Sequence, residues 1–253
     1  MCLITLHLKE HPIYKLIVAA NRDEFYNRPT APAHFWEDEP TILAGRDLLK
    51  GGTWLGVTKT GKFAALTNFR APSEMMPKEK SRGEIVSNYL KNQIAPKDYL
   101  ENIQKDQHLY PGFNILVGNP DDLYYYSNQL PTIEKVTPGT HALSNHLLNT
   151  PWPKALKSRS NLRNYVLANK SIDTDVLFDL LTDQEQAPDE QLPDTGIGLN
   201  HERLLSPLFI QMPEYGTRSS SVLLIDQNNT ITFVERTYQN GAFANEKRFE
   251  FQA

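Results

Sequence analysis

The sequence contains one cysteine, which stands at position 2 directly after the initiator methionine. Small residues at this position generally permit removal of Met1, which would make Cys2 the first residue. An N-terminal cysteine carries its own base, because an α-amine with a pKa near about 8 can take the proton of a thiol with a pKa near about 8.5. Cys2 is therefore a candidate nucleophile for acyl transfer. The alternative is an ordinary small buried residue at a strand edge.

Polar side chains also occur where apolar segments stop, and they could surround such a nucleophile. Each has an ordinary structural interpretation as a turn former, a loop cap or an ion-pair partner. Together they supply amide, carboxylate and guanidinium groups next to predicted strands. These residues are Asn21, Asp23, Asn68, Asn145 and Arg218.

Several other kinds of site are disfavoured by the sequence. It has no GxSxG, GxxxxGKS/T, HExxH or GxGxxG motif, so four common enzyme classes lack their local signatures. A single cysteine excludes an intramolecular disulfide and a multi-cysteine metal site. His141 and His146 are too unfavourably spaced on a strand to form a metal pair. We therefore expect no metal and no cofactor.

The elements that must position these residues are predicted by periodicity and capping. Residues 2–8 and 13–20 alternate as paired strands, and 53–58 and 62–69 flank a glycine-containing turn. Helices are predicted from 81, opened by a capping box, and from Pro96. The other predicted elements are strands 113–118, 123–127, 141–145, 217–225, 231–238 and 243–251, helices 154–169 and 175–183, and a long surface loop, 184–213. This order predicts an α+β fold with helices layered on two sheets, in one domain spanning 1–253.

Composition and charge narrow the partners. Of 253 residues, 40% are hydrophobic and 22% are charged, which is typical of a soluble globular protein. No apolar run approaches the roughly 20 residues that span a bilayer. A net charge of −4 gives no electrostatic footprint for nucleic acid. Because no signal peptide is recognisable, we expect a cytoplasmic protein that acts on a small molecule, with its oligomeric state open.

Five motifs together resemble the NRDE family. They are NRDE at 21–24, GGTWLG at 51–56, LTNFR at 66–70, LSN at 143–145 and YGTRSS at 215–220, so the resemblance spans nearly the whole chain. That family in turn resembles the N-terminal nucleophile hydrolases, in particular the branch of bile salt hydrolase and penicillin V acylase, which cleave non-peptide amides. The resemblance implies a four-layer αββα sandwich.

The resemblance also implies roles for the candidate residues. Cys2 matches the nucleophile, Asp23 the acid that holds its amine, and Asn68 and Asn145 the oxyanion-hole asparagines. Arg218 matches an arginine that lies near the thiol. The amidase branch has an arginine immediately before the first asparagine, where this chain has Ala20.

Strand alternation makes further predictions about this first motif. Arg22 and Glu24 should face away from the site and form structural ion pairs, because Asn21 and Asp23 point the other way.

The expected substrate is a small amide, or a related acyl compound, with an apolar acyl part. Aromatic and thioether side chains suit such a chain. Beyond Arg70, Lys78, Lys80 and Arg82, no basic cluster that could hold a phosphate is evident. An alternative is a non-catalytic protein that binds haem, lipid or acyl-CoA on the same scaffold. The substrate-binding candidates are Asn21, Trp54, Phe69 and Trp152, and Trp36, Met75 and Met76 are further rim residues.

Overall fold

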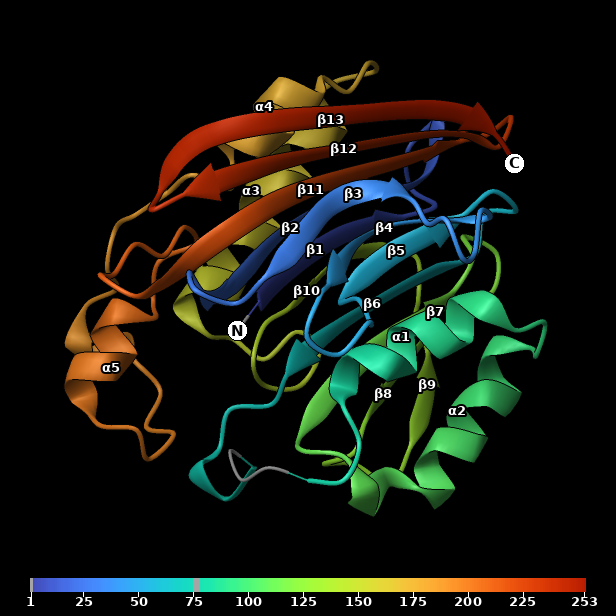
Figure 1. Ribbon diagram of the computed structural model, residues 1–253. Coiled ribbons are helices and arrows are strands. Elements are labelled where there is room, and N and C mark those ends of the chain that lie inside the picture. Colours follow the sequence, from blue (N-terminus) through green and yellow to red (C-terminus); the bar gives the residue numbers. More distant parts are fainter. Residues whose placement is uncertain (1, 75–77) are drawn as a thin grey trace.

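The computed structural model describes residues 2–74 and 78–253, and these form two stacked β-sheets covered by helices (Figure 1). The six-stranded sheet has the order β10-β1-β2-β11-β12-β13. Its strands are β1 Cys2–Leu8, β2 Tyr14–Phe25, β10 Gly139–Leu143, β11 Tyr215–Asp226, β12 Thr230–Gln239 and β13 Ala242–Gln252. Every neighbouring pair is antiparallel.

The second sheet is a seven-stranded meander in which each strand pairs with the next along the chain. Its strands are β3 Thr30–Phe35, β4 Ile42–Asp47, β5 Leu55–Thr58, β6 Phe63–Asn68, β7 Phe113–Gly118, β8 Tyr124–Ser127 and β9 Ile133–Lys135. The β5–β6 hairpin lies where the glycine-containing turn predicts it. Gly61 has a φ of 77°, a conformation that glycine adopts readily.

Helices cover the outer face of each sheet, which completes the four layers (Figure 1). Helices α1 Arg82–Lys91 and α2 Pro96–Lys105 pack on the seven-stranded sheet, and α3 Pro153–Ala168 and α4 Thr174–Asp179 on the six-stranded one. Helix α5 Leu199–Leu204 lies in the segment expected to be a loop. Short 3₁₀ helices are η1 Pro72–Glu74, η2 Gln107–Leu109 and η3 Asp189–Gln191.

Strand alternation explains the layers. Val18 packs between the sheets, whereas its neighbour Ile17 packs under α3 and α4. In β11, Leu223 likewise packs between the sheets, and its neighbour Val222 packs under the helices. The αββα prediction is therefore confirmed, because central strands of the six-stranded sheet such as β2 and β11 bury one face against the other sheet and the opposite face against helices.

Some predicted elements differ from the structure. The second strand continues past the predicted end at Ala20 to Phe25, because the polar residues of the NRDE motif still pair with β1 and β11. Strands β3 and β4 were not predicted, since Pro32 and the short apolar runs around it give a weak pattern. Among the described residues, no helix has the length and apolar character needed to cross a membrane.

Candidate functional site

Cys2 is the first residue of β1, which lies between β10 and β2 in the six-stranded sheet. Its Cα partner across β2 is Arg22, and two residues later Ile4 faces the core between the sheets. Because side chains alternate, the thiol and the Arg22 guanidinium lie on that same inner face. Cys2 is 8% exposed and lines a cavity that opens there.

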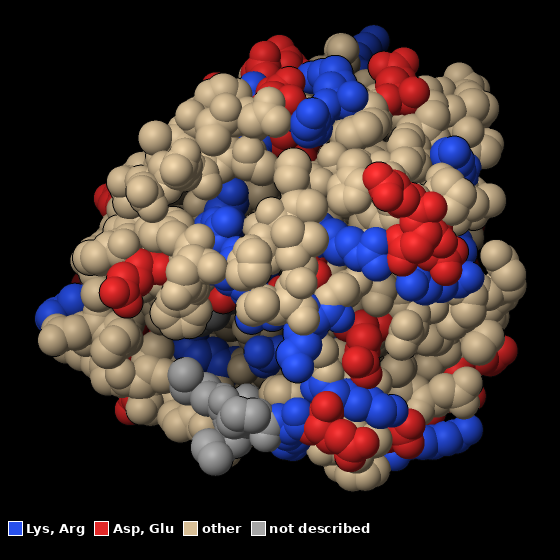
Figure 2. Space-filling model, in the orientation of Figure 1, with Lys and Arg blue, Asp and Glu red and all other residues tan. Residues whose placement is uncertain are grey.

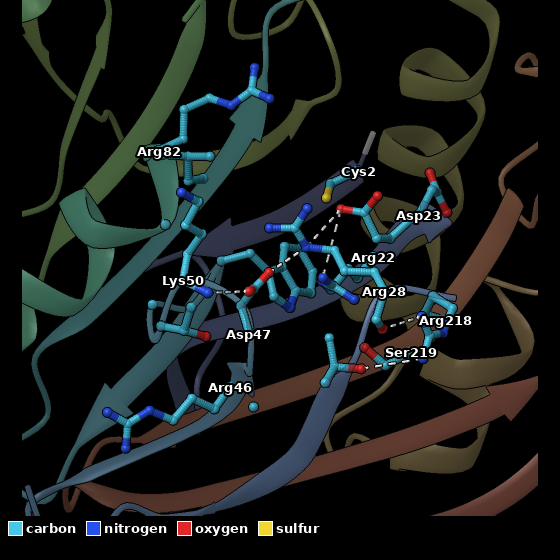
Figure 3. Close-up of a pocket in the computed structure, with 18 of the residues that line it drawn as sticks. Cys2, Arg22, Asp23, Arg28, Arg46, Asp47, Lys50, Arg82, Arg218 and Ser219 are labelled. Carbon is cyan, nitrogen blue, oxygen red and sulfur yellow. Dashed lines mark hydrogen bonds and ion pairs between the residues drawn. The ribbon is translucent and has the colours of Figure 1, made fainter. Parts of the chain in front are cut away.

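The cavity has a volume of about 770 Å³ and lies where one end of the six-stranded sheet meets strands of the other sheet and the start of α1. Figure 3 shows Cys2, Arg22 and Asp23 on one side, with Lys50 and Arg82 across from them. A cavity of this size suits a small organic molecule.

Opposing effects act on the thiol. Burial raises the pKa of Cys2, and the nearby charge of Asp23 adds to that effect. The Arg22 guanidinium and a hydrogen bond from the Asp23 backbone lower the pKa of the same thiol. Arg22 is thus the arginine beside the thiol. The prediction that Arg22 and Glu24 face away from the site is wrong, because both line the cavity. The predicted ion pairing is observed, since Arg22 Nη2 and Glu24 Oε2 are 3.8 Å apart.

Asp23 lies beside Cys2 near the end of the paired part of β2 and is 2% exposed. Thr217 Oγ1 donates a 2.8 Å hydrogen bond to Asp23 Oδ1, and the Tyr215 hydroxyl donates to the Asp23 backbone oxygen at 3.0 Å. Burial raises the pKa of this carboxyl, and the charge of Lys154 opposes the rise. The carboxyl is therefore fixed in position beneath the start of β1.

Asn68, at the end of β6, and Asn145, just after β10, are neighbours in the structure. Asn145 is fully buried, and its Nδ2 donates to the Asn68 backbone oxygen at 3.0 Å. The Arg70 amide donates to the Asn145 backbone oxygen at 2.7 Å. Asn68 itself lines the cavity, whereas Asn145 lies behind it. The two asparagines are brought together, with Asn68 facing the ligand space.

Arg218 lines the cavity from a bulge in β11, between Thr217 and Ser219. Its Nη1 donates to the backbone oxygens of Phe25 and Arg28 at 2.8 and 3.0 Å. These hydrogen bonds tie β11 to the turn between β2 and β3. Arg218 thus shapes the wall of the cavity, and the guanidinium acting on the thiol belongs to Arg22.

Of the four predicted substrate-binding residues, Trp54 lines the cavity. Asn21 faces the helix side of the sheet, where its Nδ2 donates to the backbone oxygens of Leu181 and Leu208 at 3.0 and 2.8 Å. Asn21 therefore fastens the long 184–213 segment to the sheet rather than facing the cavity.

Two other predicted aromatic contacts lie outside the cavity lining. Phe69 packs on His146, with ring centroids 4.9 Å apart, and Trp152 packs against the Arg70 guanidinium at 4.8 Å. Trp36 is fully buried in the core under α1. Met75 and Met76 lie outside the described residues.

The charge of the cavity differs from the expectation that few basic residues accompany the aromatic rim. Its described lining residues include eight Lys and Arg and five Asp and Glu, and Figure 2 shows basic side chains gathered around the hollow. Three of the basic residues lie together at 78–82, which the sequence indicated, whereas the other five come from separate segments. The eight are Arg22, Arg28, Arg46, Lys50, Lys78, Lys80, Arg82 and Arg218.

Glu235 is a cavity residue that the sequence did not indicate. It lies on β12, is 3% exposed, and its Oε1 accepts a 2.6 Å hydrogen bond from the Ala33 amide. Burial raises the pKa of Glu235 to about 7, and the Arg22 guanidinium limits the rise. Among the described residues, no group of three His, Cys, Asp or Glu side chains could hold a metal ion.

We predict a stability gain for Glu235→Gln that grows with pH. The folded protein keeps the Glu235 proton to about pH 7, whereas the unfolded chain releases it near the ordinary pKa of 4.5, so this group's contribution to stability declines as pH rises between those values. Relative to the unsubstituted protein, the variant should gain roughly 3 kcal/mol between pH 4.5 and 7.5. Urea unfolding at both pH values measures this, and Glu250→Gln on the exposed side of β13 is the control. A pH-independent difference would contradict the prediction.

Comparison with solved structures defines the class of the scaffold. A mutant of the conjugated bile acid hydrolase from Clostridium perfringens matches with a TM-score of 0.54 at 10% identity, covering 100% of this chain and 97% of that one. The N-acylethanolamine-hydrolyzing acid amidase orthologue of Caenorhabditis elegans also gives 0.54 at 10% identity, covering 88% and 92%. The fold is thus that of the N-terminal nucleophile hydrolases.

Sequence comparison places the chain within a particular family. The family model described as Transport and Golgi organisation 2 matches residues 1–240, and the chain belongs to that family. The mouse homologue is 37% identical over 94% of this chain and 93% of its own length, and the human homologue is 36% identical with the same coverage. The Drosophila melanogaster protein is 30% identical over 94% and 92%. The resemblance drawn from the NRDE motifs is confirmed.

Proposed function

We propose that this protein is a cysteine N-terminal nucleophile hydrolase that cleaves a non-peptide amide, or a related acyl bond, of a small substrate. The observation that carries the proposal is the Cys2 thiol, which opens from the first strand into the cavity beside Asp23. Removal of Met1 gives Cys2 a free α-amine next to that carboxyl. Residues 1–253 act as one unit in this proposal.

The first half of the reaction forms a thioester. The α-amine of Cys2 takes the thiol proton, and the thiolate attacks the carbonyl carbon of the substrate. Asn68 donates a hydrogen bond to the oxyanion that develops, with its backbone held by Asn145. When the C–N bond breaks, the protonated α-amine returns its proton to the leaving amine. The products at this stage are a free amine and an S-acylated Cys2.

Water completes the cycle. The α-amine accepts a proton from water as its oxygen attacks the thioester carbonyl, and the same asparagine stabilises the second oxyanion. The C–S bond breaks, the thiol recovers its proton, and a carboxylic acid leaves. One amine serves as base and acid in both halves, so this chemistry requires no histidine.

The cavity favours a substrate with both apolar and acidic parts. Trp54, Leu66 and Tyr238 supply apolar lining, which suits an acyl chain. Lys50, Lys78 and Arg82 suit a carboxylate or another anionic group on the same molecule, whereas Arg46 already pairs with Asp38. The basic lining thus refines the expected small amide into one that carries negative charge.

A substrate panel tests the proposal. Protein with Cys2 as its first residue is incubated with N-acyl amino acids, penicillin V, acyl-CoA thioesters and short peptides, and release of amine or thiol is measured. Turnover of an N-acyl amino acid, together with a mass increase of one acyl group on the peptide containing Cys2, supports the hydrolase. Binding of haem, lipid or acyl-CoA without turnover of any member would instead support the carrier alternative.

We predict that Asn68→Ala lowers kcat by about 10²–10³-fold, because it removes a donor used mainly in the transition state. KM should change little. The measurement is steady-state kinetics with the best substrate of the panel, and Asn102→Ala, on the exposed face of α2, is the matched control. A large rise in KM at unchanged kcat would assign Asn68 to substrate binding and contradict the oxyanion role.

A further inference from the structure

Lys154 is a buried cation in the first turn of α3. It is 3% exposed, and no described residue provides a hydrogen-bond partner for its Nζ. Burial lowers the pKa of Lys154 to about 8, and the Arg70 guanidinium acts in the same direction. Burying a charged lysine without such a partner costs folding free energy, so the presence of Lys154 here requires an explanation.

The docking of α3 on β1 places this lysine level with the start of the chain. Ser158 and Thr5 share a hydrogen bond between their hydroxyls, and farther along α3 the charge of Arg163 acts on His7. These two pairs show that α3 and β1 run in the same direction, so positions before Ser158 lie beside positions before Thr5. Lys154 is four residues before Ser158, about 6 Å back along the helix. Leu3 is two residues before Thr5, about 6.6 Å back along the strand. Lys154 therefore lies on the helix side of the sheet at the level of Leu3, the neighbour of Cys2 in β1, and its charge interacts with that of Cys2.

The surrounding charges show which groups Lys154 affects. The negative charges of Asp23 and of an ionised Cys2 both favour the ammonium form of Lys154, and Glu202 on α5 does so more weakly. Arg70 contributes a second positive charge from the segment after β6. The charge of Lys154 therefore acts on two groups of the proposed reaction: Cys2, which is ionised, and Asp23, which pairs with the amine.

Other titratable groups around Cys2 lie on neighbouring strands. Tyr215, on β11, is held neutral because burial and the charge of Asp23 raise its pKa. Arg22 lies on the cavity side and stabilises the thiolate from there. Positive charge thus reaches Cys2 from both faces of the sheet, from Arg22 above and from Lys154 below.

We infer that Lys154 is a positioning residue that sets the ionisation of Cys2, by stabilising its thiolate and by keeping its α-amine in the neutral, proton-accepting form. Asp23 alone would hold the amine as an ammonium ion, which cannot act as a base. The ammonium of Lys154 offsets the charge of Asp23, so the carboxyl orients the amine without fixing its proton. The inference rests on the proposed function but can be tested without a substrate.

The test is the pH dependence of Cys2 alkylation by iodoacetamide, in protein whose first residue is Cys2. In Lys154→Met we expect the alkylation rate at pH 7, where Lys154 still carries its proton, to fall about tenfold. Lys154→Arg keeps the charge and should restore most of the rate. Lys157→Met is the matched control, because Lys157 lies one turn away and pairs with Asp183 at 2.5 Å on the surface.

A second measurement uses the unsubstituted protein, in case Lys154→Met does not fold. Nitrogen-15 NMR of lysine side chains follows the Lys154 titration before and after Cys2 is alkylated. Alkylation removes the thiolate charge, so the pKa of Lys154 should fall. An unchanged alkylation profile in a folded Lys154→Met, or an unchanged Lys154 titration, would overturn the inference.

The outcomes separate this inference from the proposed function. A shifted alkylation profile in a protein that turns over no substrate would keep the role of Lys154 and reject the hydrolase. Turnover with a profile unaffected by Lys154→Met would keep the hydrolase and reject the role of Lys154.

Discussion

Cys2→Ala should reduce kcat/KM for acyl hydrolysis by at least about 10⁴-fold, because removal of the nucleophile leaves only binding and oxyanion stabilisation. The substitution removes a sulfur that faces the cavity, so the packed core between the sheets is unaffected. The melting temperature should therefore stay close to that of the unsubstituted protein. Initial rates with a panel substrate and a thermal melt give the two measurements.

Mass spectrometry supplies the control for this prediction. The unsubstituted protein should accumulate acyl groups on the peptide that contains Cys2, and the alanine variant should not. Turnover within tenfold of normal in Cys2→Ala would show that another group performs the chemistry, and the assignment of the nucleophile would be rejected.

Arg70→Met should destabilise the protein by about 3–5 kcal/mol, because it leaves the carboxylate of Glu202 buried without its partner. Arg70 Nη1 and Glu202 Oε2 are 2.7 Å apart, and their side chains are 6% and 2% exposed. For a chain of this size the melting temperature should fall by roughly 6–20 °C. The loss should be large because this ion pair fastens α5 to the segment after β6.

Urea unfolding of two further variants distinguishes the buried ion pair from general effects of losing an arginine. Arg203→Met removes an arginine from an exposed pair with Asp189 and should leave the unfolding midpoint almost unchanged. Arg70→Met combined with Glu202→Leu should be more stable than Arg70→Met alone, since the Glu202 carboxylate is no longer buried without its ion-pair partner. Equal losses in the single and double variants would contradict this account.

Much of the architecture could be predicted from the sequence because the relevant signals are local. Alternation over 2–8 predicts β1 as it is observed, and Pro96 opens α2 where its fixed φ suits a first helical turn. The five motifs together were also sufficient to predict the family and, through it, the four layers. The sequence missed β3 and β4, whose pairing depends on partners in the rest of the sheet rather than on their own pattern.

The sequence by itself determined the chemical components of the site: one thiol at position 2, a carboxylate at 23 and asparagines at 68 and 145. Only the tertiary structure decided which groups surround that thiol. The register that pairs Cys2 with Arg22 is set by hydrogen bonds between strands, and strand alternation within β2 cannot reveal which face becomes the cavity.

The remaining features of the site depend on contacts between distant segments. Glu235 reaches the Ala33 amide across 202 positions, and Lys154 reaches the nucleophile because α3 docks on β1. Most of the basic lining is assembled in the same way, since five of its eight residues come from segments other than 78–82. Burial and proximity, which give these groups their altered pKa values, arise only when the sheets and helices pack together.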